Sequence, residues 1–146
     1  MTRISTMRVV RLLLAALLFV PLACAAQEAG TVEKISPQDA AAQVSAGKAV
    51  LVDVRERSEL DAGMAQGAHW YPTSSIKSDP DGFHQFIASL PADQTIVLYC
   101  ASGGRSGKAA EIATQQGRKA ANAGGFKDWK EAGLPVAAPA KDLSPG

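Results

Sequence analysis

Apolar residues gather in short blocks along this chain, and polar segments with helical spacing separate the blocks. Two runs, 49–54 and 95–99, are almost entirely apolar, which is typical of parallel strands buried on both faces. Helical spacing is predicted over 37–47, 81–90 and about 105–116. Strands that alternate with helices at this spacing imply right-handed crossovers. We therefore expect an α/β fold, in which a central mostly parallel sheet of about five strands carries helices on both faces.

Shorter segments complete the predicted order of elements. Three stretches are predicted as short strands or extended pieces: 32–35, 67–71 and 119–122. A short helix is expected over 57–62 and a last helix around Phe126 and Trp129. Residues 72–80 contain many turn-forming residues, which predicts a loop without regular structure.

The first 26 residues have the pattern of a secretory signal peptide. Residues 1–11 carry three arginines and no acidic residue, and an uncharged stretch follows over 12–26. The stretch ends in small residues, so cleavage after Ala25 or Ala26 is expected. It is too short for a comfortable membrane span of about 20 residues. We therefore expect export to the periplasm or secretion, and no stable membrane span.

Cys24 leaves an alternative open, because its surroundings could also be a lipoprotein processing site. Pro21, three residues before it, fits such a site poorly, so soluble export is preferred to a lipid anchor. In either case Cys24 is no disulfide partner for Cys100, the other cysteine. The expected organisation is a domain over 27–136 and a flexible tail over 137–146.

Charge adds little to this interpretation. The whole chain has a net charge of +1, and without the three leader arginines 12 basic residues stand against 14 acidic ones. No basic stripe suggests nucleic acid as a partner. About 120 residues after the leader are enough for one domain with a modest core. The oligomeric state cannot be read from the sequence.

The candidate chemistry lies directly after the second apolar run, where Cys100 ends the predicted strand. In open α/β sheets, ligands bind outside the carboxyl ends of the strands. The amino end of the next helix adds free N–H groups and partial positive charge. Both should favour the thiolate form of Cys100. The six residues expected to surround its sulfur are Ala101, Ser102, Gly103, Gly104, Arg105 and Ser106.

A plainer interpretation is that Cys100 is a small apolar residue filling a strand end. That interpretation explains neither the two glycines nor the arginine of the loop. A free thiol in an oxidising compartment is also a liability unless it is used. A reactive cysteine is therefore the preferred interpretation.

Three stretches of the chain resemble motifs of the rhodanese family of sulfurtransferases. The segment from Cys100 to Arg105, of form C-x-x-x-x-R, looks like the family's active-site loop. Residues 53–68 are similar to its D-x-R-E…E…G-H-I-x-G-A signature, and 124–136 to its G-G-F-x-x-W-x-x-x-G-L-P-V signature. The resemblance covers about residues 35–136, with Met64 standing where the family usually has histidine.

The resemblance implies a single rhodanese-like domain that transfers sulfur. In that chemistry the Cys100 thiolate takes the sulfane sulfur of a small anionic donor such as thiosulfate and holds it as a persulfide. A thiophilic acceptor, cyanide or a thiol, then collects the sulfur. Arg105 and the loop amides would bind the donor, and Asp53 with Arg55 would brace the active-site loop. No metal or cofactor is required.

Other functions remain as alternatives. The related Cys-dependent phosphatases and arsenate reductases resemble this chain in the Cys…Arg loop but have arginine in the sixth place after cysteine, whereas Arg105 is fifth and Ser106 sixth. A non-catalytic module that carries sulfur or binds a partner is also possible in principle, although retention of Cys100 argues against it. His69 and His84 have no third ligand nearby in sequence, so we expect structural or surface roles rather than metal binding.

Overall fold

A computed structural model of the protein describes residues 31–146. The predicted signal peptide, its cleavage sites and Cys24 lie outside the described residues. Within the described part of the chain, no helix is long and apolar enough to cross a membrane.

A sheet of five parallel strands forms the centre of the domain, in the order β1-β6-β5-β2-β4. The strands are β1 (Glu33–Lys34), β2 (Ala49–Asp53), β4 (His69–Trp70), β5 (Thr95–Cys100) and β6 (Ala120–Gly125). The two apolar runs become β2 and β5, which pair from Ala49 with Thr95 to Asp53 with Tyr99. The predicted α/β fold with a mostly parallel sheet of about five strands is confirmed.

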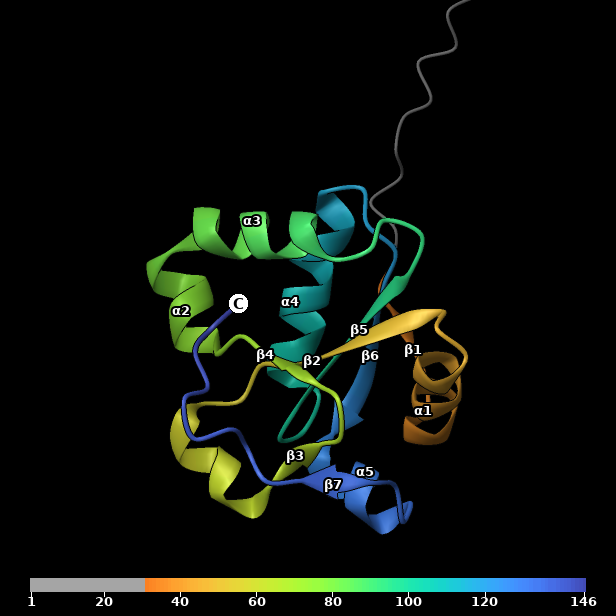
Figure 1. Ribbon diagram of the computed structural model, residues 1–146. Helices are drawn as coiled ribbons and strands as arrows, with labels where there is room; N and C mark the ends of the chain where they lie inside the picture. The colour runs from red at the N-terminus through yellow and green to blue at the C-terminus, as the bar shows by residue number, and fades with distance from the viewer. Residues whose placement is uncertain (1–30) are drawn as a thin grey trace, which may run out of the picture.

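Helices cover both faces of this sheet, as Figure 1 shows. They are α1 (Pro37–Ser45), the 3-10 helix η1 (Arg57–Ala62), α2 (Thr73–Ser78), α3 (Pro80–Ser89), α4 (Gly104–Gln115) and α5 (Phe126–Glu131). Side chains from α2, α3 and α4 form one apolar core with alternate residues of β2 and β5, such as Val52 and Leu98. On the opposite face, side chains from α1 and α5 pack with the intervening residues of β2 and β5, such as Leu51 and Val97. This two-faced burial is why the two runs contain almost no polar residue.

The prediction of an irregular loop over 72–80 is wrong, because α2 occupies most of these residues. The helix follows Pro72, and its Ile76 side chain is buried in the core with α3. Its first turn is also fixed from a distance, since the backbone N–H and the hydroxyl of Ser74 both donate to the Glu56 carboxylate, at 3.0 and 2.6 Å. Tertiary contacts of this kind stabilise a helix whose own residues are poor helix formers.

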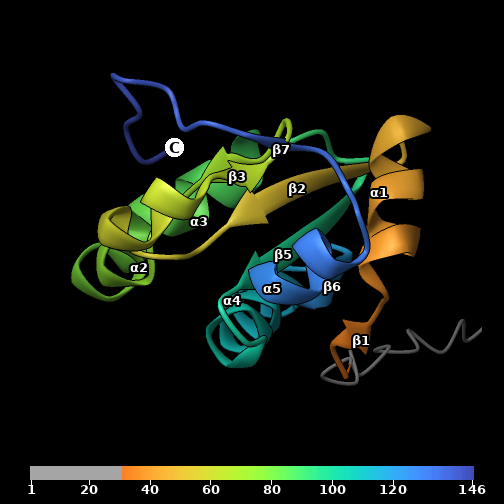
Figure 2. The same cartoon turned by 90° about the horizontal axis from the view of Figure 1, so that it is seen from below.

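The C-terminal segment differs from the expected flexible tail. Val136 and Ala137 form β7, which pairs antiparallel with β3 (Met64–Ala65), and Figure 2 shows the two strands side by side. Met64, at the family's usual histidine position, is buried with Leu60 and Trp70. Farther on, Leu143 packs on this small cluster, and the N–H of Gly146 donates to the carbonyl of Trp70 at 3.2 Å.

Both edges of the five-stranded sheet are short. The edge strands β1 and β4 contain two residues each. In β1 the two residues are the charged pair Glu33 and Lys34, both exposed. The longer strands β2, β5 and β6 lie between these edge strands, with β5 at the centre, and each is paired on both sides along part of its length.

Candidate active site

Cys100 is the last residue of the central strand β5, and α4 begins at Gly104. The residue is fully buried and is the free cysteine of the described chain. Its sulfur accepts a hydrogen bond from the N–H of Gly103 at 3.1 Å, and the Ser106 hydroxyl oxygen lies 3.4 Å away. The cysteine thus lies at the carboxyl edge of the sheet, where its sulfur meets hydrogen-bond donors of the loop and of the first turn of α4.

These donors favour the ionised sulfur. Burial by itself raises the pKa of Cys100, but hydrogen bonds from the Ser106 hydroxyl and from the N–H groups of Ser106, Ser102 and Gly103 outweigh it, and the pKa falls below its ordinary value. A thiolate is the nucleophilic form of cysteine. The buried sulfur is therefore prepared for reaction by polar neighbours rather than surrounded by hydrocarbon alone.

This shift gives a pH-dependent prediction. Because only the thiolate alkylates, the rate of Cys100 modification by iodoacetamide should reach half its maximum at a pH below about 8.5, the midpoint of an ordinary thiol. In Ser106→Ala the midpoint should move to higher pH, since one donor to the thiolate is lost. A midpoint unchanged by Ser106→Ala would contradict the role of this hydroxyl.

Two glycines allow the loop to fold closely around the sulfur. Gly103 has a φ of +91°, and a Cβ added there would lie 3.2 Å from the Cα of Gly124. A Cβ added to Gly125, which pairs with Cys100 across β5 and β6, would lie 2.5 Å from the carbonyl oxygen of Ala101. The loop therefore rests directly on the backbone of β6, and this contact explains the Gly-Gly pair of the C-terminal motif.

Arg105 lies at the loop but does not stand alone. Its Nη1 and Nη2 donate to the two carboxylate oxygens of Glu59 at 2.6 and 2.7 Å, and both side chains are about one-third exposed. The hydrogen bonds to Arg105 hold the pKa of Glu59 below its ordinary value. The same bonds raise the pKa of Arg105, and the charge of Cys100 raises it further. The sequence contained this partner as the second glutamate of the D-x-R-E…E motif, but gave no sign of the pairing.

Asp53 and Arg55 lie deeper and act on the segment that carries Glu59. Arg55 donates through Nε and Nη2 to the Asp53 carboxylate, the shortest contact being 2.6 Å, and the pair is almost fully buried. Its other hydrogen bonds go to the carbonyls of Glu59 and Gly63, at 3.1 and 2.7 Å. The Tyr99 hydroxyl donates to Asp53 at 2.6 Å. This arrangement fixes η1 to the sheet, and through Glu59 it fixes the position of Arg105.

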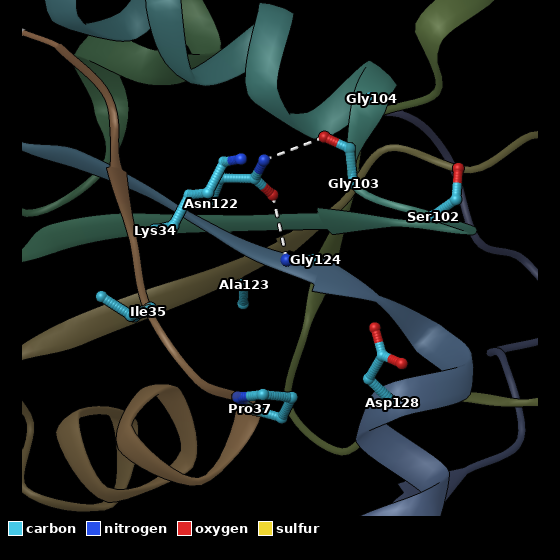
Figure 3. Close-up of a pocket in the computed structure, with 10 residues that line it drawn as sticks. All are labelled: Lys34, Ile35, Pro37, Ser102, Gly103, Gly104, Asn122, Ala123, Gly124 and Asp128. Atoms are coloured by element: carbon cyan, nitrogen blue, oxygen red, sulfur yellow. Dashed lines mark hydrogen bonds between the residues drawn. The ribbon is translucent and has the colours of Figure 1, made fainter.

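Two hollows flank the loop. One, of about 230 Å³, lies between η1 and α5 and is lined by Arg55, Glu59, Ala101, Phe126, Lys127 and Lys130. The other, of about 460 Å³ and shown in Figure 3, lies beside β1 and β6. It is lined by Lys34, Ile35, Pro37, Ser102, Gly103, Gly104, Asn122, Ala123, Gly124 and Asp128. The active-site loop thus forms part of the wall of both hollows.

The two histidines have other surroundings. The ring of His69 packs edge-on against Phe86 with centroids 6.1 Å apart, and His84 lies 3.9 Å from Asp81 on the exposed side of α3. Within residues 31–146, no group of three or more potential ligands is arranged to hold a metal ion.

Comparison with known proteins agrees with the geometry. The family model for the rhodanese-like domain matches residues 36–132. A sulfurtransferase from Allochromatium vinosum is 35% identical over 92 residues, which are 62% of this chain and 79% of that protein. The human thiosulfate:glutathione sulfurtransferase is 33% identical over 97 residues, 60% of this chain and 84% of that protein.

Solved structures show the same likeness. The crystal structure of a rhodanese-related protein from Thermoplasma volcanium is 27% identical, with a TM-score of 0.60, and the match covers 73% of this chain and 98% of that one. The sulfurtransferase relatives support sulfurtransferase activity in general. With the family model matching most of the chain and a buried cysteine held at the rim of a parallel sheet, this protein belongs to the rhodanese-like family.

Proposed function

We propose that this protein moves a sulfane sulfur from a small anionic donor such as thiosulfate to a thiophilic acceptor, cyanide or a thiol, through a persulfide on Cys100. The observation that carries the proposal is the position of the Cys100 sulfur, which accepts the N–H of Gly103 at 3.1 Å and lies 3.4 Å from the Ser106 hydroxyl oxygen. These donors lower the pKa of the thiol. A lowered pKa increases the share of the thiol present as thiolate, which is the nucleophilic form of cysteine.

The proposed reaction has two steps. The Cys100 thiolate attacks the outer sulfur of thiosulfate, so that a new S–S bond forms, the S–S bond of thiosulfate breaks, and sulfite leaves with its electron pair. Cyanide then attacks the outer sulfur of the persulfide, thiocyanate forms, and the thiolate returns. Neither step transfers a proton to or from the protein, which suits a site with no histidine at the sulfur.

Arg105 is proposed to bind the oxygen atoms of the donor. A guanidinium has five N–H donors, and two of those of Arg105 are used by Glu59. The remaining donors are available for charge-assisted hydrogen bonds to the oxyanion. Glu59 then fixes the plane of the guanidinium and supplies a counter-charge that limits how tightly an anion binds.

The experiment that tests the proposal is a mass measurement. The full chain has two cysteines, so a Cys24→Ser variant leaves Cys100 as the single thiol. After treatment with thiosulfate and removal of excess donor, its mass should rise by one sulfur atom, and added cyanide should remove that sulfur and release thiocyanate. Absence of the adduct would contradict the proposal and would favour a non-catalytic module.

The role of Arg105 is tested with two donors. In Arg105→Ala, KM for thiosulfate should rise roughly tenfold or more, because a charge-assisted hydrogen bond to the oxyanion is lost. An uncharged organic polysulfide should be affected much less. Arg57→Ala removes an exposed arginine of η1 with no ion pair in the described structure, and serves as the matched control. An equal loss with both donors would reject the anion-binding role.

A further inference from the structure

Asn122 links strand β6 to the active-site loop, although no sequence motif pointed to it. Its side chain is almost fully buried. The carboxamide Nδ2 donates to the carbonyl of Gly103 at 2.8 Å, and Oδ1 accepts the N–H of Gly124 at 3.0 Å, as Figure 3 shows. The same Oδ1 lies 2.8 Å from the hydroxyl oxygen of Ser106.

These contacts fix which way the carboxamide points. Nδ2 faces a carbonyl, which can only accept, and Oδ1 faces an N–H, which can only donate. A flipped carboxamide would place Oδ1 against the Gly103 carbonyl, two acceptors, and Nδ2 against the Gly124 N–H, two donors. Oδ1 therefore faces Ser106 as an acceptor, and Ser106 is the donor between them.

The Ser106 hydroxyl has one proton and two acceptors within reach. One is Asn122 Oδ1 at 2.8 Å, and the other is the sulfur of Cys100 at 3.4 Å. Ser106 is fully buried, so water does not supply a third acceptor. A buried donor without an acceptor is costly, so the proton needs an acceptor in every state of the site.

The sulfur meets this need in only one state. A thiolate is a strong acceptor, whereas a neutral thiol sulfur accepts weakly. The inner sulfur of a persulfide is also uncharged, because the negative charge lies on the outer sulfur. During the proposed reaction the sulfur of Cys100 therefore alternates between a strong and a weak acceptor for the same proton.

We propose that Asn122 is a positioning residue that receives the Ser106 hydroxyl whenever the Cys100 sulfur is uncharged, and releases it when the thiolate forms. This inference rests on the proposed function, since it assigns the hydroxyl a direction in each step of sulfur transfer. When the hydroxyl turns away, Oδ1 keeps its hydrogen bond from Gly124, so the carboxamide is never left without a partner. Rotation about one C–O bond is the only movement required.

Other charged groups near the sulfur act independently of this hydroxyl. Arg105 of α4 interacts with the charge of Cys100 and is paired with Glu59 of η1. Asp128 of α5 and Lys34 of β1 line the larger hollow, beside β1 and β6. Asp53 and Arg55 of β2 and its following loop neutralise each other. Their influence on the sulfur is the same whether or not Ser106 carries its hydroxyl.

A double-mutant cycle isolates the proposed link. The pKa of Cys100 is measured from the pH dependence of iodoacetamide alkylation in a Cys24→Ser background, with and without Ser106→Ala. In Asn122→Leu the hydroxyl has only the sulfur as acceptor, which favours the thiolate. The change in pKa caused by Asn122→Leu should therefore be about 0.5–1 pH unit more negative when Ser106 is present than when it is alanine.

Asn122→Asp should change the pKa of Cys100 in the opposite direction. An aspartate has nearly the same shape and is a stronger acceptor, so it should raise the pKa of Cys100 more when Ser106 is present than when it is alanine. The through-space effect of the new charge is the same in both backgrounds and cancels in the difference. If circular dichroism shows that Asn122→Leu is unfolded, the comparison of Asn122→Asp with and without Ser106→Ala is sufficient to test the proposal.

For the variants that fold, equal changes in the pKa of Cys100 with and without Ser106→Ala would overturn the proposed role of Asn122. A residue that only holds the loop in place would change this pKa by the same amount whether or not Ser106 is present. Alkylation does not require sulfur transfer. A failed cycle in a protein that still forms the thiosulfate adduct therefore rejects this inference alone, whereas a missing adduct rejects the proposed function.

Discussion

Cys100→Ser should abolish sulfur transfer, lowering thiocyanate formation on the order of 10⁴-fold or more. Serine fits the same space and can accept the hydrogen bond that the Gly103 N–H gives to the sulfur. It is not ionised at neutral pH, however, and an oxygen cannot form the persulfide. The measurement is the initial rate of thiocyanate formation from thiosulfate and cyanide.

The serine variant also identifies the atom that carries the sulfur. In the Cys24→Ser background it has no thiol, so the mass gain after thiosulfate should disappear. Cys100→Ala should behave in the same way, and thermal unfolding of the variants provides the control for folding. A mass gain that survives in Cys100→Ser would show that another group is the nucleophile.

Asp53→Ala should lower the free energy of unfolding by about 3–5 kcal/mol, the cost of leaving a buried charge without its partner. Arg55 is 3% exposed, and its short contact to Asp53 is the only ion pair that it makes in the described structure. The Tyr99 hydroxyl would lose its acceptor as well. Urea unfolding with linear extrapolation measures this loss, which is large compared with the about 5–15 kcal/mol that holds a typical domain folded.

Two comparisons make the stability test specific. Asp61→Ala removes an exposed acidic residue of η1 and should change the free energy of unfolding by less than about 0.5 kcal/mol. Replacing both members of the buried pair with apolar residues, Asp53→Leu with Arg55→Met, should restore much of the loss, because no charge is then left unpaired. A loss below about 1 kcal/mol in Asp53→Ala would contradict the structural importance of this pair.

The central part of the fold was predictable because its signal is local. The runs that form β2 and β5 are apolar at nearly every position, which burial on both faces requires, and α4 is bounded by glycines. The loop after Cys100 was likewise visible in the sequence, since a strand end, two glycines and an arginine are adjacent in it. Local patterns of this kind do not depend on the rest of the structure.

The features that were missed depend on residues far apart in the chain. Glu59 and Arg105 are 46 positions apart, and their pairing requires η1 to be fixed beside α4. Strand β6 was expected to stop before its glycines, because glycine disfavours strands. The strand nevertheless continues to Gly125, where the Ala101 carbonyl leaves no room for a side chain. Asn122 became recognisable only once the pairing of β5 with β6 was known.

The short edge strands of the main sheet, one of which is charged, have a consequence for self-association. A long apolar edge would offer free N–H and C=O groups on which a second molecule could add a strand and begin a fibril. Here β1 offers two residues, both charged, and β4 offers two more. The aggregation-prone strand β5 is enclosed between β2 and β6, and β4 covers β2 at Val52 and Asp53, so the native protein should resist fibril formation through β5 even when it is concentrated.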